Sequence, residues 1–265
     1  MKTQESCLSE AIENKIHRAV TDGHEFFWHR FGGAPDFLGQ RILEIGFGHG
    51  ALSVEMALQG ASKVVGTDIR EQFAAAATSY VDKRQPDIAD RIEFTVRPLS
   101  ELPSASFDLI ISKDAFEHII DVPTMLRDIT RALTPSGRVF IGFSPFYYSP
   151  YGDHDRRLTA FRNLGLLGKM LAAIPWGHLI FEPWIIRNQD RIQDFDVRSM
   201  QDLNLNKLSI GDFRTLIQAT RLKADYFAVN QGKSYIGAIL SRFRAIPGLE
   251  KYVTYNLYCI LRRIE

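Results

Sequence analysis

The sequence has few cysteines and no long uncharged apolar run. Its 2 cysteines, Cys7 and Cys259, match no metal-ligand spacing, so we expect free thiols in a reducing compartment. No apolar stretch reaches the roughly 18 residues that a membrane-spanning helix needs. The first ten residues are too polar for a signal peptide. These absences predict a cytoplasmic protein without an integral membrane segment.

An excess of charge of one sign is also missing. The 32 basic and 31 acidic residues leave a formal net charge of +1. No run of Lys or Arg is present to neutralise a line of phosphates, so we expect no nucleic-acid partner. Hydrophobic residues, in contrast, make up 45% of the 265 residues. That content is enough for the core of one α/β domain with an elaboration.

Short apolar runs alternate with helical stretches from residue 41 onward. Each run is typical of a strand that is buried on both faces of a sheet. The alternation predicts a Rossmann-like α/β fold, in which a parallel sheet has helices on both faces. The expected strands are RILEI, KVVGTD, IEFTV, FDLIIS and RVFIGF, and the expected helices span residues 7–31, 51–59, 70–84 and 121–133.

The alternation stops after the fifth strand and resumes at Ser209, which forms a capping box with Asp212. A helix, the strand LKADYFAV, a helix over 235–252 and the strand TYNLYCILRR are expected to follow. The β-branched and aromatic residues of the last run favour a strand over a membrane-surface helix. We therefore expect an N-terminal helical segment (1–37), a cofactor-binding core (38–143), an insertion that forms a substrate cap (144–208) and a completion of the core (209–265).

Three glycines follow the first expected strand, where ligands bind in an open α/β sheet. Gly46, Gly48 and Gly50 let the backbone approach a ligand closely. Glu44 stands two residues before the first of them. Its carboxylate can accept a hydrogen bond from a cationic amino group, which the methionine part of S-adenosylmethionine (SAM) carries and a pyrophosphate lacks. The pattern therefore favours SAM as the cofactor.

Asp68 ends the second expected strand, 22 residues after Gly46. An acid there can bind both hydroxyls of a ribose, with Ile69 beside it. Lys113, at the end of the fourth strand, is expected to line the pocket at the methionine end. The glycine spacing also satisfies the dinucleotide-binding pattern, so a nicotinamide cofactor stays open as an alternative.

These motifs resemble the class I SAM-dependent methyltransferases, in particular the broad small-molecule group. The resemblance implies a seven-stranded sheet whose last strand is antiparallel. It also implies that Glu44 and the three glycines hold the methionine part of SAM and that Asp68 holds the ribose. The matching segments are 44–50, 65–68, 107–112, 116–119 and 133–137, within a close resemblance over 38–143 and a looser one over 209–263.

One position departs from this family. An acid that contacts the adenine amino group is expected after the third strand, where this chain has Pro98. Proline has neither a side-chain acceptor nor a backbone N–H. Recognition of adenine would then rest on backbone groups near Leu99 and Ser100.

Two histidines are candidates for the base that takes a proton from an acceptor. His154 lies between Asp153 and Asp155, which we expect to stabilise its imidazolium. A turn position facing water is the alternative for His154. His118, just beyond the fourth strand, is the second candidate. The spacing matches no standard metal site, so no metal is expected.

Aromatic residues are dense in the insertion. They either line an acceptor pocket, with Tyr147, Tyr151, Trp176 and His178 as its substrate-binding residues, or form the insertion's own core. Phe27 and Trp28 likewise either cover the cofactor or pack on the sheet. We expect methyl transfer from SAM to a small organic acceptor, at oxygen, such as a sugar, a lipid-linked glycan or a secondary metabolite. An NAD(P)-dependent oxidoreductase and a non-catalytic SAM-binding protein are the alternatives.

Overall fold

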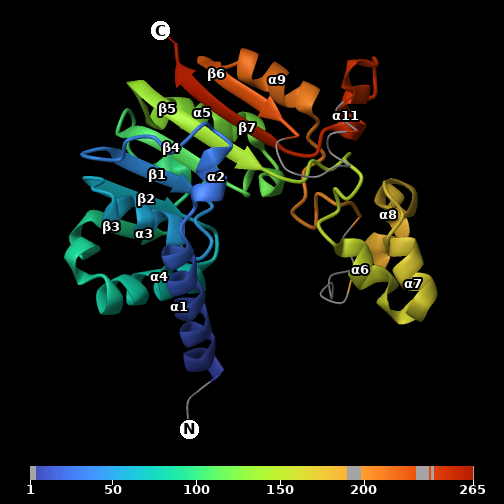
Figure 1. Ribbon diagram of the computed structural model, residues 1–265, viewed down its shortest axis with the longest axis horizontal. Coiled ribbons are helices and arrows are strands. Elements are labelled where there is room, and N and C mark those ends of the chain that lie inside the picture. The colour runs from blue at the N-terminus through green and yellow to red at the C-terminus, as the bar shows by residue number, and fades with distance from the viewer. Residues whose placement is uncertain (1–3, 190–197, 231–238, 240–241, 265) are drawn as a thin grey trace.

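The computed structural model describes residues 4–189, 198–230, 239 and 242–264. Seven strands form one sheet in the order β3-β2-β1-β4-β5-β7-β6 (Figure 1). β7 runs antiparallel to both of its neighbours, and the pairs among β1 to β5 are parallel. The predicted seven-stranded fold is therefore confirmed. The strands are β1 (Arg41–Ile45), β2 (Lys63–Thr67), β3 (Ile92–Thr95), β4 (Phe107–Lys113), β5 (Leu133–Phe143), β6 (Leu222–Val229) and β7 (Leu257–Arg263).

Helices cover both faces of the sheet. One face packs against α1 (Gln4–Asp22), α2 (Glu25–His29), α3 (Ala51–Leu58) and α4 (Glu71–Arg84), and the other against α5 (Val122–Ala132) and α9 (Ile210–Gln218). Alternation within β1 shows how one strand serves both layers. Ile42 belongs to the first apolar cluster, whereas Leu43 and Ile45 belong to the second, because successive side chains of a strand point to opposite faces.

The N-terminal segment is two helices and not the single helix expected over 7–31. α1 ends at Asp22 because Gly23 has a φ of +70°, a left-handed conformation that glycine adopts readily. Phe27 and Trp28 of α2 are buried against the sheet, and the ring centroids of Trp28 and Phe140 lie 6.1 Å apart. These two aromatic residues therefore pack on the sheet.

The stretch after β5 folds into helices of its own. α6 (Arg156–Phe161), α7 (Gly165–Ala172) and α8 (Gly177–Arg187) lie together beside the sheet (Figure 1). They enclose a small apolar core. Under it lies a buried ion pair, in which Arg157 Nε is 2.9 Å from Asp153 Oδ2. Arg157 also donates a hydrogen bond to the carbonyl of Ile174, just after α7. The Asp153–Arg157 ion pair is therefore linked to the chain that leaves α7.

The C-terminal part completes the sheet. The predicted capping box is confirmed, since the backbone N–H of Ser209 donates to Asp212 and the N–H of Asp212 donates to Ser209. The helix expected over 235–252 falls partly outside the described residues. In the described part Ile239 is helical, but no single helix runs to residue 252, because a 3₁₀ turn (Arg242–Ala245) and α11 (Glu250–Val253) are separated by Pro247 and Gly248. Among the described residues, no helix is long and apolar enough to cross a membrane.

Candidate active site

The glycine bend, residues 46–50, joins β1 to α3. Gly46, Gly48 and Gly50 have φ angles of +73°, +57° and +81°, which residues with a side chain rarely adopt. A Cβ on Gly46 would lie 2.5 Å from the Cβ of Ala115, so only glycine fits. A Cβ on Gly48 would meet nothing nearer than Arg70 Nη2 at 4.0 Å. The backbone at Gly48 is therefore open to a ligand.

Glu44 is a buried acid at this bend. Its side chain is 3% exposed and accepts a hydrogen bond of 2.5 Å from Ser53 Oγ. Burial raises the pKa of Glu44 to about 7, although the Ser53 hydrogen bond opposes the shift. A cation placed against this carboxylate would stabilise its charged form.

Asp68 is a second carboxylate at this bend, bound to its middle glycine. Its Oδ2 accepts a hydrogen bond of 3.0 Å from the N–H of Gly48. Burial opposes ionisation of Asp68, but hydrogen bonds from Arg70 and Gly48 outweigh it and hold its pKa below the usual value. The structure thus sets two carboxylates of different protonation behaviour around one bend.

A pocket of about 330 Å³ opens at the bend. It brings together four of the predicted cofactor residues, Glu44, Gly46, Gly48 and Lys113. Other lining residues were not predicted from the sequence. Lys15 and His24 come from the N-terminal helices, and no local pattern could have placed them here because their position depends on how α1 packs on α3 and α4. The further lining residues are Ala19, Phe47, His49, Ala51, Leu52, Arg70 and Asp114.

The remaining predicted cofactor residues, Gly50, Asp68, Ile69 and Leu99, do not line this pocket. Gly50 caps α3 and packs on Phe94, since a Cβ there would lie 2.7 Å from that ring. Ile69 follows Asp68 and is 87% exposed. Leu99 has a buried side chain and begins the 3₁₀ turn Leu99–Glu101. The first N–H groups of such a turn have no partner within it, so they are available to a ligand.

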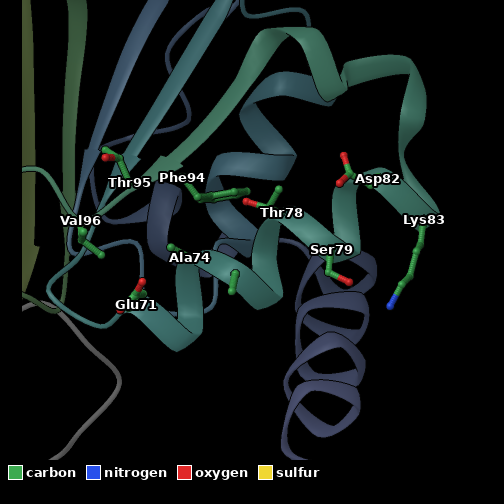
Figure 2. A pocket seen from close by; sticks show the side chains of 10 residues that line it. Glu71, Ala74, Thr78, Ser79, Asp82, Lys83, Phe94, Thr95 and Val96 are labelled. Carbon is green, nitrogen blue, oxygen red and sulfur yellow. The ribbon is translucent and has the colours of Figure 1, made fainter. Parts of the chain in front are cut away.

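A larger pocket lies elsewhere. It measures about 620 Å³ and is formed by α4 and β3, with Phe94 on one side and Thr78 on the other (Figure 2). No residue of the glycine bend lines it. This larger pocket contains none of the predicted cofactor residues, whereas the pocket at the bend is lined by Glu44 and by the open backbone at Gly48.

The two predicted base candidates come together although 36 positions separate them. The ring centroids of His118 and His154 lie 5.0 Å apart. Burial, followed by the nearby His118, lowers the pKa of His154 to about 4. Next to them, burial raises the pKa of Glu117 to about 8. His154 is therefore neutral at neutral pH, and its lowered pKa makes it a weaker proton acceptor than an ordinary histidine.

The charge of Asp153 raises the pKa of His154, as expected, but it is the smallest of the causes and burial outweighs it. Asp153 is fully buried and its carboxylate is taken up by Arg157, whose Nε lies 3.0 and 2.9 Å from the two oxygens. The pairing of Asp153 with Arg157 was not expected, because the two residues are four positions apart across the start of α6 and only adjacent residues had been considered. Asp155, on the other side, is exposed.

The predicted substrate residues belong largely to the core of the insertion. Tyr147 is 3% exposed and donates a 2.6 Å hydrogen bond to Glu182. His178 is fully buried, with Nε2 2.6 Å from the Tyr147 carbonyl. Tyr151 is 42% exposed, and Trp176 donates to the carbonyl of Tyr252. Tyr147 and His178 have no open path to an acceptor in this arrangement, and a substrate role for all four stays a prediction.

The strand order, the antiparallel β7 and the glycine bend between two carboxylates define the class I SAM-dependent methyltransferase fold. Residues 43–141 match the protein family described as "Methyltransferase domain". This part of the chain is therefore a methyltransferase domain of class I.

Two curated relatives illustrate the similarity. The chain is 33% identical over 111 residues to the ubiquinone biosynthesis O-methyltransferase of Neisseria meningitidis. The matching region covers 41% of this chain and 45% of that protein. It is 32% identical over 123 residues to the 27-O-demethylrifamycin SV methyltransferase of Amycolatopsis mediterranei. This match covers 46% of this chain and 44% of that protein. The chain thus spans less than half the length of these relatives.

Solved structures share the fold over most of the chain. A SAM-dependent methyltransferase from Mesorhizobium loti superimposes with a TM-score of 0.57 at 18% identity, covering 92% of this chain and 100% of that one. A geranyl diphosphate C-methyltransferase from Streptomyces coelicolor, solved with Mg²⁺, geranyl diphosphate and S-adenosyl-L-homocysteine, has a TM-score of 0.57 at 13% identity, covering 99% and 85%. At these identities the similarity concerns the fold alone.

Proposed function

We propose that this chain binds SAM at the glycine bend and transfers its methyl group to an oxygen of a small organic acceptor. One observation carries the proposal: buried Glu44 lines the pocket at the bend, and Asp68 accepts a hydrogen bond from Gly48, where the backbone is open. The carboxylate of Glu44 can accept hydrogen bonds from the amino group of SAM, and that of Asp68 can accept them from the ribose hydroxyls. The names of the two O-methyltransferase relatives support oxygen as the methylated atom.

The pocket residues divide the cofactor between them. Glu44 accepts hydrogen bonds from the amino group, and Lys113 lies at the same methionine end. Asp68 accepts hydrogen bonds from the ribose hydroxyls. Exposed Ile69 offers an apolar surface to the adenine, and the backbone N–H groups at Leu99 and Ser100 take the place of the missing acid at Pro98. Gly46 and Gly48 let the cofactor lie close to the chain.

Bound SAM supplies an electrophilic methyl group, and the protein supplies orientation and a place for the proton. His154, neutral at neutral pH, is the first candidate to receive the proton of an acceptor hydroxyl, and His118 is the second. We propose residues 144–208 as the acceptor cap, with Tyr147, Tyr151, Trp176 and His178 shaping it. Exposed apolar side chains on α7 and α8, such as Leu166 and Ile180, favour an acceptor with an apolar part. We place the reaction in the cytoplasm.

Calorimetry with SAM and with NAD(H) separates this proposal from an oxidoreductase. We expect saturable binding of SAM at one site per chain and none of NAD(H); the reverse result would overturn the proposal. A tritiated-methyl transfer assay with a cell extract as the source of acceptor then tests catalysis. Label transferred to a small molecule supports an enzyme, whereas tight SAM binding without transfer identifies a non-catalytic SAM-binding protein.

A further inference from the structure

Three potential metal ligands meet where the core touches the insertion. Glu117 and His118 lie in the 3₁₀ turn Phe116–His118 after β4, and His154 lies just before α6. Each offers one ligand atom, and these atoms lie within 4.8 Å of one another. Two ligand atoms at about 2.1 Å from one tetrahedral ion are about 3.4 Å apart. The three atoms would therefore have to approach one another by up to about 1.4 Å, within the reach of side-chain rotation, to share one coordination sphere.

The ligand atoms are free to bind. Glu117 is 4% exposed, and its Oε2 has no hydrogen-bond partner among the described residues. The same holds for His154 Nε2. A buried carboxylate oxygen and a buried imidazole nitrogen without partners are costly in a folded protein. A cation shared between them would remove both costs at once.

Both histidines are oriented for coordination through Nε2. His118 Nδ1 lies 2.8 Å from the carbonyl of Asn204, which can only accept, so Nδ1 carries the proton. The Pro145 backbone, whose only polar group is its carbonyl, raises the pKa of His154, which places this carbonyl near the ring. Nε2 of His154 has no hydrogen-bond partner among the described residues. Donation of one ring N–H to a carbonyl, with the other nitrogen left free, is the usual arrangement of a metal-binding histidine.

The surrounding chain holds the cluster in place. The backbone N–H of Asn206 donates to the Glu117 carbonyl at 3.0 Å, and its side chain donates to the carbonyls of Phe116 and Ile119 at 2.6 and 2.7 Å. His154 adopts a left-handed φ of +50°, next to the buried Asp153–Arg157 ion pair. Such backbone conformations in residues other than glycine gather at functional sites.

We propose that Glu117, His118 and His154 bind a divalent transition-metal ion. Two imidazoles and one carboxylate suit Zn²⁺ or Fe²⁺ better than Mg²⁺ or Ca²⁺, which prefer oxygen. Three protein ligands leave further positions open, and exposed His118 marks the side that solvent reaches. The use of those positions rests on the proposed function, because Glu117 follows Asp114, a residue of the pocket at the glycine bend, by three positions. With an ion bound, Nε2 of neither histidine could take up a proton. The ion would then replace the histidine base, since it would lower the pKa of an acceptor hydroxyl bound to it, and the proton would pass to solvent.

Zinc titration of the untagged, chelator-treated protein without SAM tests the site. We expect one equivalent of Zn²⁺ by calorimetry, and visible ligand-field absorption when Co²⁺ replaces it. Glu117→Gln, His118→Ala and His154→Ala should each weaken binding by about tenfold or more. His29→Ala, which removes an exposed histidine outside the cluster, should leave it unchanged. No binding, or binding that survives His154→Ala and Glu117→Gln, would overturn the proposal.

Anomalous scattering from a wild-type crystal soaked in Zn²⁺ avoids the problem of variants that do not fold. A peak between the three side chains, at about 2.0–2.2 Å from their ligand atoms, supports the site. A peak only elsewhere contradicts it. The outcome is independent of SAM binding. A protein that binds SAM but no Zn²⁺ would support the proposed function and rule out this site. A protein that binds Zn²⁺ here but no SAM would support the site and rule out the proposed function.

Discussion

Asp68 and Arg70 form a two-pronged ion pair at the carboxyl end of β2. Arg70 Nε lies 2.9 Å from Oδ1, and Arg70 Nη2 lies 3.0 Å from Oδ2. The N–H groups of Gly48 and Arg70 add one donor to each oxygen. Two donors per oxygen fill the lone pairs of the carboxylate. A ribose can therefore bind this carboxylate only when the Arg70 side chain moves away.

Arg70→Ala is expected to strengthen SAM binding. The Arg70 side chain is 48% exposed, and an exposed ion pair contributes about 0.2–1 kcal/mol. Its removal should tighten binding by roughly 1.4- to 5-fold, as measured by calorimetry. Arg84→Ala, at the far end of α4, is the matched control and should have no effect. Weaker binding by Arg70→Ala would mean that Arg70 itself contacts the cofactor.

Asp68→Ala should have the opposite effect. It removes charge-assisted hydrogen bonds to the ribose and is expected to weaken SAM binding by roughly 1–3 kcal/mol. The same calorimetric titration measures it. The melting temperature of the variant without ligand controls for loss of the Gly48 hydrogen bond. Unchanged affinity in a folded variant would place the ribose elsewhere.

SAM affinity should depend on pH through Glu44. In the free protein burial raises the pKa of this acid to about 7, whereas a bound amino group favours the carboxylate and lowers the pKa. Below about pH 7 binding must therefore release a proton from Glu44. The affinity should fall as the pH is lowered, approaching about tenfold per pH unit.

Calorimetry at several values between about pH 5.5 and 7.5 checks this profile. Glu44→Gln keeps the shape of the side chain but has no titrating group, so it should bind SAM weakly and with a flat profile over this range. A flat profile for the wild-type protein would show that Glu44 does not meet the amino group.

Gly46→Ala should destabilise the fold more than Gly39→Ala. Both glycines have left-handed φ angles, +73° and +72°, so each alanine costs roughly 1–2 kcal/mol for its backbone conformation. Only at Gly46 does the new Cβ also clash with Ala115, whereas nothing lies within 4 Å at Gly39. We expect a free energy of unfolding at least about 1 kcal/mol lower for Gly46→Ala in urea titrations. Equal losses would mean that the bend is not tightly packed.

Much of the sheet could be predicted from local sequence. The run LKADYFAV has the same bounds as β6, and RILEI has the same bounds as β1. Both were predictable because short apolar runs bounded by turns are typical of buried strands. The capping box at Ser209 was readable for the same reason, since its two partners are three residues apart. The antiparallel direction of the last strand came only from the resemblance to a family.

Contacts between distant segments could not be predicted. His154 was expected to interact with its neighbour Asp153, but the fold pairs Asp153 with Arg157 and places His154 beside Glu117 and His118. Lys15 and His24 reach the cofactor pocket only through the packing of the N-terminal helices. A metal site was not expected because its ligands come from two segments whose distance along the chain carries no signal.

A crystal structure of the protein with S-adenosyl-L-homocysteine tests the central claim most directly. The account predicts that the amino group of the ligand lies within hydrogen-bond distance of the Glu44 carboxylate. It also predicts that the ribose hydroxyls replace the Arg70 guanidinium on Asp68. A ligand that leaves the Asp68–Arg70 pair intact, or that turns its amino group away from Glu44, would contradict the account.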